Sequence, residues 1–298
     1  MSKFEEIKSL LQQKTEFKEN LFFYLPCLSN FQKEEIDFHN TIFGAEEDAH
    51  QLLSLRNKFY HEYFKKWLFK LPKDSTILEV GSGIGYDLLP LINKGFNLVV
   101  SDISSSSLHH LQEKIKNYIP VDNPEQLLYL VADGEHLPFN DNSLDAIYMV
   151  ACLHHFENQQ NAIKEFYRVL KSSGLIIFAM EPSHFMMFFT KIFSNFKKLR
   201  IHKGESVADE NHPGYLSKDF NQLLNQNFLI IKKKRVWLLQ GVVHYFLEAC
   251  YRLFNLTKRI VLPKWLEYFL LSLDEILLFI PILNWFSWHW IVVARKNK

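Results

Sequence analysis

The sequence predicts an α/β fold built on a mostly parallel sheet, and two observations support this. Short apolar segments alternate with segments of helical pattern at 85–94, 104–118 and 158–170. The apolar segments are 76–80, 97–101, 127–131, 144–150 and 174–180. Strands that are apolar throughout are typical of a parallel sheet with helices on both faces. The first of these apolar segments, 76–80, also runs directly into a glycine-rich turn.

Four regions divide the chain. Residues 1–72 have stretches of helical spacing and are predicted to form an N-terminal helical cap over the ligand-binding edge of the sheet. Residues 73–238 hold the alternating core, which ends in a sixth strand at 228–238. Residues 239–286 form an apolar helical insertion, and residues 287–298 carry the last strand of the core.

Composition and charge exclude several classes of protein. The 298 residues have a net charge of +1 and no recognition motif, so we expect no nucleic-acid partner. The three cysteines, Cys27, Cys152 and Cys250, lie far apart, which argues against a disulfide framework or a zinc site. The first residues lack a signal-peptide pattern. The sequence therefore predicts a cytoplasmic protein in a reducing compartment.

The turn after the first core strand is suited to bind a ligand. Glu79 lies two positions before Gly81, and Gly83 and Gly85 follow at alternate positions. Such a turn exposes backbone N–H groups at a helix N-terminus. A dinucleotide-binding turn has its third glycine one position later, where this chain has Tyr86. The spacing thus differs from that of the nicotinamide-binding proteins.

Two acids end the next two strands. Asp102 follows Gly85 by 17 residues and could accept hydrogen bonds from both hydroxyls of a ribose, or cap the following helix. Asp133 ends the third strand and could accept a hydrogen bond from an adenine amino group. Together with the turn, these acids indicate a nucleoside-containing ligand.

Several segments resemble one family. The spacing E-x-G-x-G-x-G from Glu79 to Gly85 resembles the first motif of the class I S-adenosylmethionine-dependent methyltransferases. The segment 133–145 resembles the D-x-x-x-L-P-F…S-F-D segment of the small-molecule (type 11-like) branch, with Leu144 replacing phenylalanine. The segment 165–174 resembles the family's E-x-x-R-V-L-K-P-G-G turn. The close resemblance covers residues 75–181.

The resemblance implies a fold and a cofactor. The fold would be a Rossmann-like, seven-stranded, mostly parallel sheet with an antiparallel last strand, and the cofactor would be S-adenosylmethionine. The family usually joins its sixth and seventh strands by a simple hairpin, so the insertion at 239–286 is a departure. The expected cofactor-binding residues are Glu79, Gly81, Gly83, Gly85, Asp102, Ile103, Asp133, Gly134, Val150 and Arg56.

The end of the fourth strand holds the candidate catalytic groups. Leu153, His154 and His155 follow this strand, and a Leu-His-His sequence is common there in small-molecule methyltransferases. Either histidine could take a proton from an acceptor, because imidazole titrates near neutral pH. Glu181, just past the fifth strand, could also face the acceptor. We expect no metal, since no linear cluster of ligands is present.

The sequence thus predicts an enzyme that moves a methyl group to O, N or C of a small or lipid-like acceptor. Two alternatives remain: a non-catalytic binding module that keeps the fold, and an NAD-dependent oxidoreductase. The retained glycines, acids and histidines count against the first alternative. The glycine spacing counts against the second.

The apolar C-terminal region leaves three hypotheses open. Between Glu275 and Arg295 lie 19 residues without an ionisable Asp, Glu, Lys or Arg, but Pro281 and Asn284 interrupt them, and we expect no membrane span. The aromatic segment 185–193 is followed by Lys197, Lys198 and Arg200 and contains Lys191. We favour a hydrophobic cap over an amphipathic acceptor. Peripheral membrane contact and a homodimer interface are the alternatives.

Overall fold

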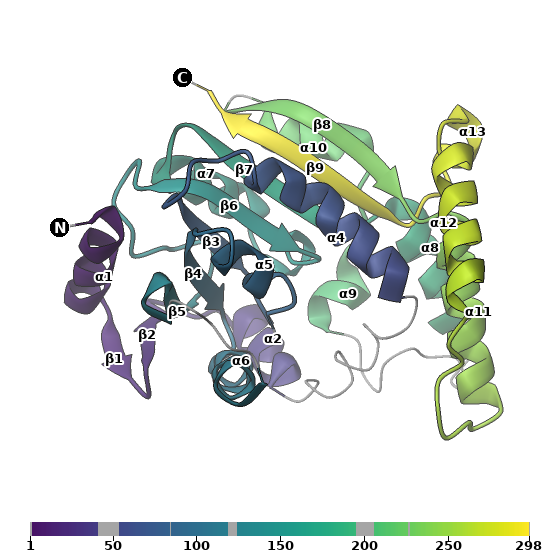
Figure 1. The fold of residues 1–298 in the computed structure, drawn as a ribbon, viewed down its shortest axis with the longest axis horizontal. Helices are drawn as coiled ribbons and strands as arrows, with labels where there is room; N and C mark the ends of the chain where they lie inside the picture. Colours follow the sequence, from purple (N-terminus) through teal and green to yellow (C-terminus); the bar gives the residue numbers. More distant parts are fainter. Residues whose placement is uncertain are drawn as a thin grey trace.

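A single sheet with helices on both faces organises the fold (Figure 1). The computed structural model describes residues 2–40, 54–83, 85–118, 124–194, 206–225 and 227–297. Within these residues the strand order is β1-β2-β5-β4-β3-β6-β7-β9-β8. The strands are β1 (Glu16–Lys18), β2 (Leu21–Tyr24), β3 (Thr76–Val80), β4 (Asn97–Asp102), β5 (Leu127–Ala132), β6 (Leu144–Val150), β7 (Leu170–Pro182), β8 (Phe228–Val236) and β9 (His289–Lys296).

The pairing of the strands confirms the predicted fold class. All neighbours from β2 to β7 in the sheet are parallel. The last strand, β9, lies antiparallel between β7 and β8. The alternating core of the sequence therefore forms a parallel sheet, and the insertion separates β8 from β9 as expected.

The seven expected strands of the core are present as β3 to β9, and only the N-terminal cap needs correction. Within the described residues β1 and β2 of the cap form a hairpin, and β2 pairs with β5, so the cap adds two strands to the edge of the sheet. The cap is therefore not entirely helical. The run Leu21–Tyr24 is only four residues long, and such short apolar runs are ambiguous by periodicity alone. Its three aromatic residues favour a strand.

Two groups of helices cover the two faces of the sheet. Leu78 and Val80 point to one face and Ile77 to the other, as alternation along a strand requires. The first face is covered by α1 (Lys3–Lys14), α7 (Gln159–Val169) and α10 (Ser217–Leu224). The second face is covered by α4 (Ser54–Leu68), α5 (Leu88–Ile92) and α6 (Ser105–Tyr118). Of the helical pattern expected within residues 1–72, positions 41–53 lie outside the described residues, and α4 is described from Ser54 onward.

The remaining helices lie at the ligand-binding edge and in the insertion. Near that edge are α2 (Asn30–His39), η2 (Leu153–His155), α8 (His184–Ser194) and α9 (Val207–Asn211), whereas η1 (Pro124–Gln126) precedes β5. The insertion contains α11 (Leu239–Leu253), α12 (Lys264–Leu277) and α13 (Pro281–Asn284), which lie together at one end of the molecule (Figure 1). No helix among the described residues has the length and apolar character needed to cross a membrane.

Buried polar contacts attach the insertion to the core. Asp274 is fully buried on α12 and accepts hydrogen bonds from the backbone N–H groups of Leu238, Leu239 and Gln240, at 3.0, 2.7 and 3.2 Å. A carboxylate at this end of α11 also interacts favourably with the helix dipole. The ring of Trp288 packs so closely on Gly241 that a Cβ there would lie 2.2 Å from it. The insertion is therefore a docked part of the fold.

The contact between Gly241 and Trp288 gives a test of this docking. We expect Gly241→Ala to lower the free energy of unfolding by about 1–3 kcal/mol, because the buried indole cannot move aside without overpacking. Chemical denaturation measures the change. Ser272→Ala on the exposed side of α12 is the control. Equal stability of the two variants would contradict the tight packing described here.

Candidate functional site

A cavity with a volume of about 440 Å³ lies at the carboxyl ends of β3, β4, β5 and β6. The chain runs from β3 to β4 and β5 on one side, and then crosses to β6 on the other side of β3. Ligands of open α/β sheets bind at such a switch point. Most of the predicted cofactor-binding residues line the cavity: Glu79, Gly81, Gly83, Asp102, Ile103, Asp133, Gly134 and Val150.

The turn after β3 takes a path that requires glycine. Gly81, Gly83 and Gly85 have φ angles of 66°, 48° and 69°, a region that L side chains rarely adopt. A Cβ at Gly81 would lie 2.4 Å from the sulfur of Cys152, and one at Gly85 would lie 2.4 Å from Leu111. Gly81 and Gly83 line the cavity, whereas Gly85 is not among its lining residues and allows α6 to approach the turn.

Asp102 fixes this turn and also faces the cavity. Its carboxylate accepts a hydrogen bond from the N–H of Gly83 at 2.9 Å and another from the N–H of Ser104 at 2.9 Å. Each oxygen has one of these partners, and a carboxylate oxygen can accept a second hydrogen bond. Asp102 can therefore both hold the backbone before α6 and contact a ligand in the cavity.

Asp133 lines the same cavity as Asp102 and is buried. It accepts hydrogen bonds from the backbone N–H of His136 at 2.7 Å and lies 3.0 Å from Nδ1 of the same residue. Burial raises the pKa of Asp133, and the contacts with His136 oppose that rise. The two acids that end β4 and β5 thus converge on one space, as the sequence predicts.

Glu79 is a buried acid whose Oε2 has no hydrogen-bond partner within the described residues. Burial, together with the negative charge of Asp87, raises the pKa of Glu79 to about 8. This carboxyl group also lines the cavity. An unsatisfied buried acid of this kind favours a cationic ligand, which would stabilise its ionised form.

Three titratable residues beside the glycine turn were not predicted from the sequence. Nδ1 of His61 and Nζ of Lys65 each lie 2.6 Å from the carboxylate of Asp87. Burial favours the neutral acid, but the two partners outweigh it and lower the pKa of Asp87. His61 and Lys65 lie four residues apart on α4 and therefore share one face of the helix. This spacing is the sequence signal that could have predicted their common partner. His61 and Asp87 line the cavity.

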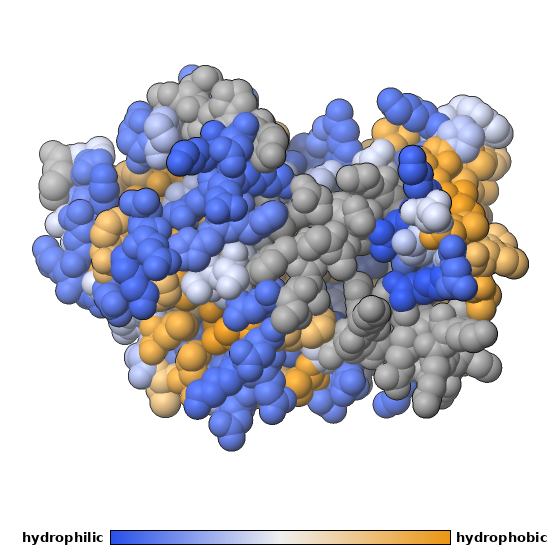
Figure 2. Space-filling model, turned by 90° about the horizontal axis from the view of Figure 1, so that it is seen from below, coloured by the Kyte–Doolittle hydropathy of each residue, from blue (hydrophilic) through white to orange (hydrophobic). Residues whose placement is uncertain are grey.

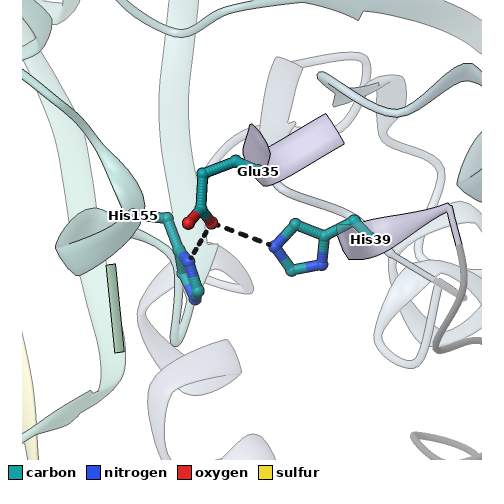
Figure 3. Close-up of side chains that lie close together, drawn as sticks. All are labelled: Glu35, His39 and His155. Atoms are coloured by element: carbon teal, nitrogen blue, oxygen red, sulfur yellow. Dashed lines mark hydrogen bonds and ion pairs between the residues drawn. The ribbon is translucent and has the colours of Figure 1, made fainter. Parts of the chain in front are cut away.

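His155 belongs to a cluster with two residues of α2 (Figure 3). Its Nδ1 lies 2.8 Å from Oε2 of Glu35, and Nε2 of His39 lies 3.5 Å from the same oxygen. Burial alone would raise the pKa of Glu35, but the hydrogen bonds from the two imidazoles lower it. Burial and the nearby His154 lower the pKa of His155. The pair is therefore a neutral imidazole beside a carboxylate.

His154 and Glu181 form a second, more deeply buried pair. Glu181 accepts hydrogen bonds from the backbone N–H groups of Cys152 and Leu153 at 2.9 and 2.8 Å, and lies 2.9 Å from Nδ1 of His154. Burial opposes a charge on His154, but Asp209 and Glu181 outweigh it and raise its pKa to about 9. Glu181 has no exposed surface and is not among the residues that line the cavity, so this placement does not support its predicted direct catalytic role.

Arg56 also lies elsewhere than predicted. Its guanidinium stacks on the ring of Trp237 with 3.4 Å between the charged carbon and the ring centroid, and it is buried. It hydrogen-bonds to Asn57 at 3.1 Å and is not among the residues that line the cavity. The predicted contact with a cofactor carboxylate is therefore not supported. Trp237, which directly follows β8, holds the side chain of Arg56. No local sequence pattern around Arg56 reveals this contact.

Residues from distant segments form groups with the composition of a metal site. Ligand atoms of Glu35, His39 and His155 all lie within 4.8 Å of one another, as do those of His154, His155 and Asp209. The expectation of no metal was based on linear spacing, which cannot detect such groups. The hydrogen bond between His155 and Glu35 gives the first group a second chemical use, the handling of a proton.

The comparisons with known proteins agree with this geometry. Residues 78–178 match the methyltransferase domain family. The sheet order, the cavity at the switch point and this match identify the domain. Within residues 78–178 the chain therefore carries a methyltransferase domain, and its fold is that of the class I S-adenosylmethionine-dependent methyltransferases.

Among curated relatives, the chain is 29% identical over 164 residues to ubiquinone/menaquinone biosynthesis C-methyltransferase UbiE of Rickettsia prowazekii (strain Madrid E). It is 31% identical over 164 residues to the protein of that name from Rickettsia felis (strain ATCC VR-1525 / URRWXCal2). Both matches cover 50% of this chain and 65% of the relative. The chain thus matches less than two thirds of the length of these relatives.

Solved structures share the fold at lower identity. A Galdieria sulphuraria protein described as a sarcosine dimethylglycine methyltransferase has a TM-score of 0.56 at 15% identity, with 82% of this chain and 86% of that chain covered. Phosphoethanolamine N-methyltransferase 2 of Haemonchus contortus, solved with S-adenosylhomocysteine, has a TM-score of 0.50 at 15% identity, with 76% and 49% covered. At these identities the likeness concerns the fold alone.

The raised pKa of Glu79 predicts a pH-dependent stability. The folded protein holds this proton up to about pH 8, whereas the unfolded chain releases it near the ordinary value of 4.5. Folding therefore loses stability as the pH rises through this interval. We expect Glu79→Gln to remove that loss, so that its stability relative to the parent protein increases from pH 5 to pH 9.

Urea denaturation at the two pH values measures this difference. Glu62→Gln, whose side chain is exposed on the same helix as His61, is the control and should show no such trend. A stability difference for Glu79→Gln that stays constant, or that shrinks as the pH rises, would show that Glu79 is ionised in the folded protein.

Proposed function

We propose that this chain is an S-adenosylmethionine-dependent methyltransferase that moves a methyl group to a small or amphipathic acceptor. One observation carries the proposal. The glycine turn after β3 and the acids that end β4 and β5 all line a single cavity at the switch point of the sheet. The methyltransferase relatives support the same reaction class.

The residues that line the cavity fit this cofactor. Glu79 offers a buried carboxyl whose Oε2 has no hydrogen-bond partner to the cationic methionine part, and Gly81 and Gly83 allow close approach of the backbone. Asp102 retains acceptor capacity for ribose hydroxyls, and Asp133 offers a carboxylate to an adenine amino group. When bound, the sulfonium group of S-adenosylmethionine supplies an activated methyl carbon.

We assign the general base to His155. Glu35 is an ionised acceptor, so Nδ1 of His155 holds the proton and donates to it, and Nε2 then carries a lone pair. His155 lines the cavity and can take a proton from an acceptor there. Glu35 would stabilise the imidazolium that results, as an orienting carboxylate does in other acid–histidine pairs.

His154 and Glu181 act as positioning residues in this proposal. Glu181 fixes the turn after β6 through backbone N–H groups and holds His154 beside His155, with ring centroids 4.1 Å apart. The charge on His154 disfavours a second charge on its neighbour, so it keeps His155 neutral before the reaction. The protein thereby keeps a base available near neutral pH.

The acceptor is proposed to have an apolar part. Phe38, Phe156, Met186 and Met187 line the cavity on the side of α2 and α8. The curated relatives are named as ubiquinone/menaquinone biosynthesis C-methyltransferases, so precursors of lipid-soluble quinones are the first acceptors to test. The purified protein would be incubated with a deuterated methyl donor and lipid or polar extracts, followed by mass spectrometry. Absence of labelled product across all extracts, with cofactor binding intact, would favour the non-catalytic binding module.

The role of Asp102 can be measured by calorimetry. Because hydrogen bonds to a charged group contribute about 1.5–3 kcal/mol each, we expect Asp102→Ala to weaken binding of S-adenosylhomocysteine by roughly tenfold to a hundredfold. Asp141→Asn, an exposed acid outside the cavity, is the control. Because Asp102 also holds the turn, thermal unfolding of both variants is compared. An unchanged affinity would remove Asp102 from the ribose.

The role of His155 can be separated from binding. We expect His155→Gln to lower kcat by about 10²–10⁴-fold while the Kd for S-adenosylhomocysteine changes little, because general-base catalysis contributes in this range. Glu35→Gln should lower kcat by less, since it removes only the orienting charge. His109→Gln, at a partly exposed histidine of α6 outside the cavity, is the control. A variant that loses cofactor affinity but keeps kcat would reassign His155 to binding.

A further inference from the structure

The insertion exposes an apolar surface that the proposed function leaves unexplained. Phe279, Ile282 and Trp265 are 86%, 75% and 70% exposed, and Phe246, Phe269 and Trp285 are more than half exposed. We call the surface formed by these six residues the apolar face. The six residues lie on α11, α12 and α13 and in the short segments that follow α12 and α13. Figure 2 shows hydrophobic surface along the end of the molecule that these helices form. Contiguous exposed apolar patches mark interaction sites.

The acids of the insertion are directed inward. Glu248, Glu267 and Asp274 are buried. Glu267 accepts a hydrogen bond from the backbone N–H of Leu55 on α4, and Asp274 accepts from the start of α11. Glu275 pairs with Lys234 and accepts a hydrogen bond from Tyr60. The insertion therefore buries or pairs its carboxylates against the protein.

Basic residues, in contrast, remain at the surface near the apolar face. Lys258 and Lys264 are exposed in and next to the turn between α11 and α12. Arg252 and Arg259 flank the same turn and share one carboxylate, that of Glu248, at 2.8 and 3.1 Å. The turn thus combines an excess of positive charge with exposed aromatic and aliphatic side chains. This combination is typical of a surface that binds anionic lipid.

Helix α8 connects the insertion with a wall of the cavity. On α8, Met186 and Met187 line the cavity, and Phe188 and Ile192 are exposed. Phe189 of the same helix contacts the rings of Tyr245 on α11 and Trp288. No described residue of α11–α13 lines the cavity, whereas Met186 and Met187 of the aromatic segment 185–193 do, so a hydrophobic cap over the acceptor stays a prediction for that segment. The predicted cations at Lys197, Lys198 and Arg200 lie outside the described residues.

We propose that the apolar face docks this protein onto the surface of an anionic lipid bilayer. The exposed tryptophans and lysines fit the interface between headgroups and acyl chains, where apolar rings and positive charges are both stabilised. Docking brings α8, and with it the cavity wall, close to the lipid surface.

Flotation with vesicles tests the proposal without requiring any catalytic activity. The full chain is mixed with vesicles of phosphatidylcholine alone or of phosphatidylcholine with phosphatidylglycerol. We expect co-flotation with the anionic vesicles, and weaker binding at high salt because the charges are screened. The double variant Trp265→Ser/Phe279→Ser should lose roughly tenfold or more in partitioning, since two apolar side chains no longer enter the bilayer.

The double variant Lys258→Glu/Lys264→Glu should also lose about tenfold or more on anionic vesicles, because the headgroups attract the lysines and repel the glutamates that replace them. Phe17→Ser/Leu229→Ser, at exposed apolar positions on β1 and β8, is the matched control and should bind as the parent does. Thermal unfolding confirms that each variant is folded.

Two results would overturn the proposal. The first is no co-flotation with anionic vesicles, or equal binding by the control and the Trp265→Ser/Phe279→Ser variants. The second is a dimer in light scattering that the Trp265→Ser/Phe279→Ser variant converts to a monomer without any lipid binding, which would assign the face to contact between copies. Neither result depends on whether the protein transfers methyl groups.

Discussion

The site depends on one close packing arrangement, the approach of the turn after β3 to α6 and to the loop after β6. Gly81 and Gly85 have no space for a Cβ, because Cys152 and Leu111 occupy it, and the backbone there has positive φ angles. Asp102 then fixes the turn through the N–H of Gly83. The same contacts that hold the turn also leave its backbone facing the cavity, so fold and binding surface arise from a single geometric requirement.

Buried carboxylates divide between two tasks around this turn. Asp87 and Glu181 are surrounded by cations or backbone N–H groups, which lower their pKa values, and these residues organise the structure. Glu79 and Asp133 have raised pKa values because burial dominates, and both line the cavity. Acids held in an unfavourable environment can be stabilised by a cationic or hydrogen-bonding ligand. The direction of the pKa shift therefore distinguishes the acids that support the structure from the acids that are available to a ligand.

The sequence predicted the parts of this arrangement that depend on local pattern. Alternating apolar strands predicted the parallel sheet, and the glycine spacing with Asp102 and Asp133 predicted which residues line the cavity. Contacts between distant segments could not be predicted in this way. Glu35 reaches His155 only because β2 joins the sheet and positions α2, and Arg56 stacks on Trp237, which lies far along the chain. The predicted domain boundaries remain predictions.

The central claim is that this cavity is shaped for an adenosyl sulfonium and its product, and not for a dinucleotide. Ligand-induced thermal shifts with S-adenosylhomocysteine and with NAD, measured side by side on the full chain, test it most directly. The account predicts a rise in Tm with S-adenosylhomocysteine that grows with its concentration, and no rise with NAD. A rise with NAD alone would contradict it.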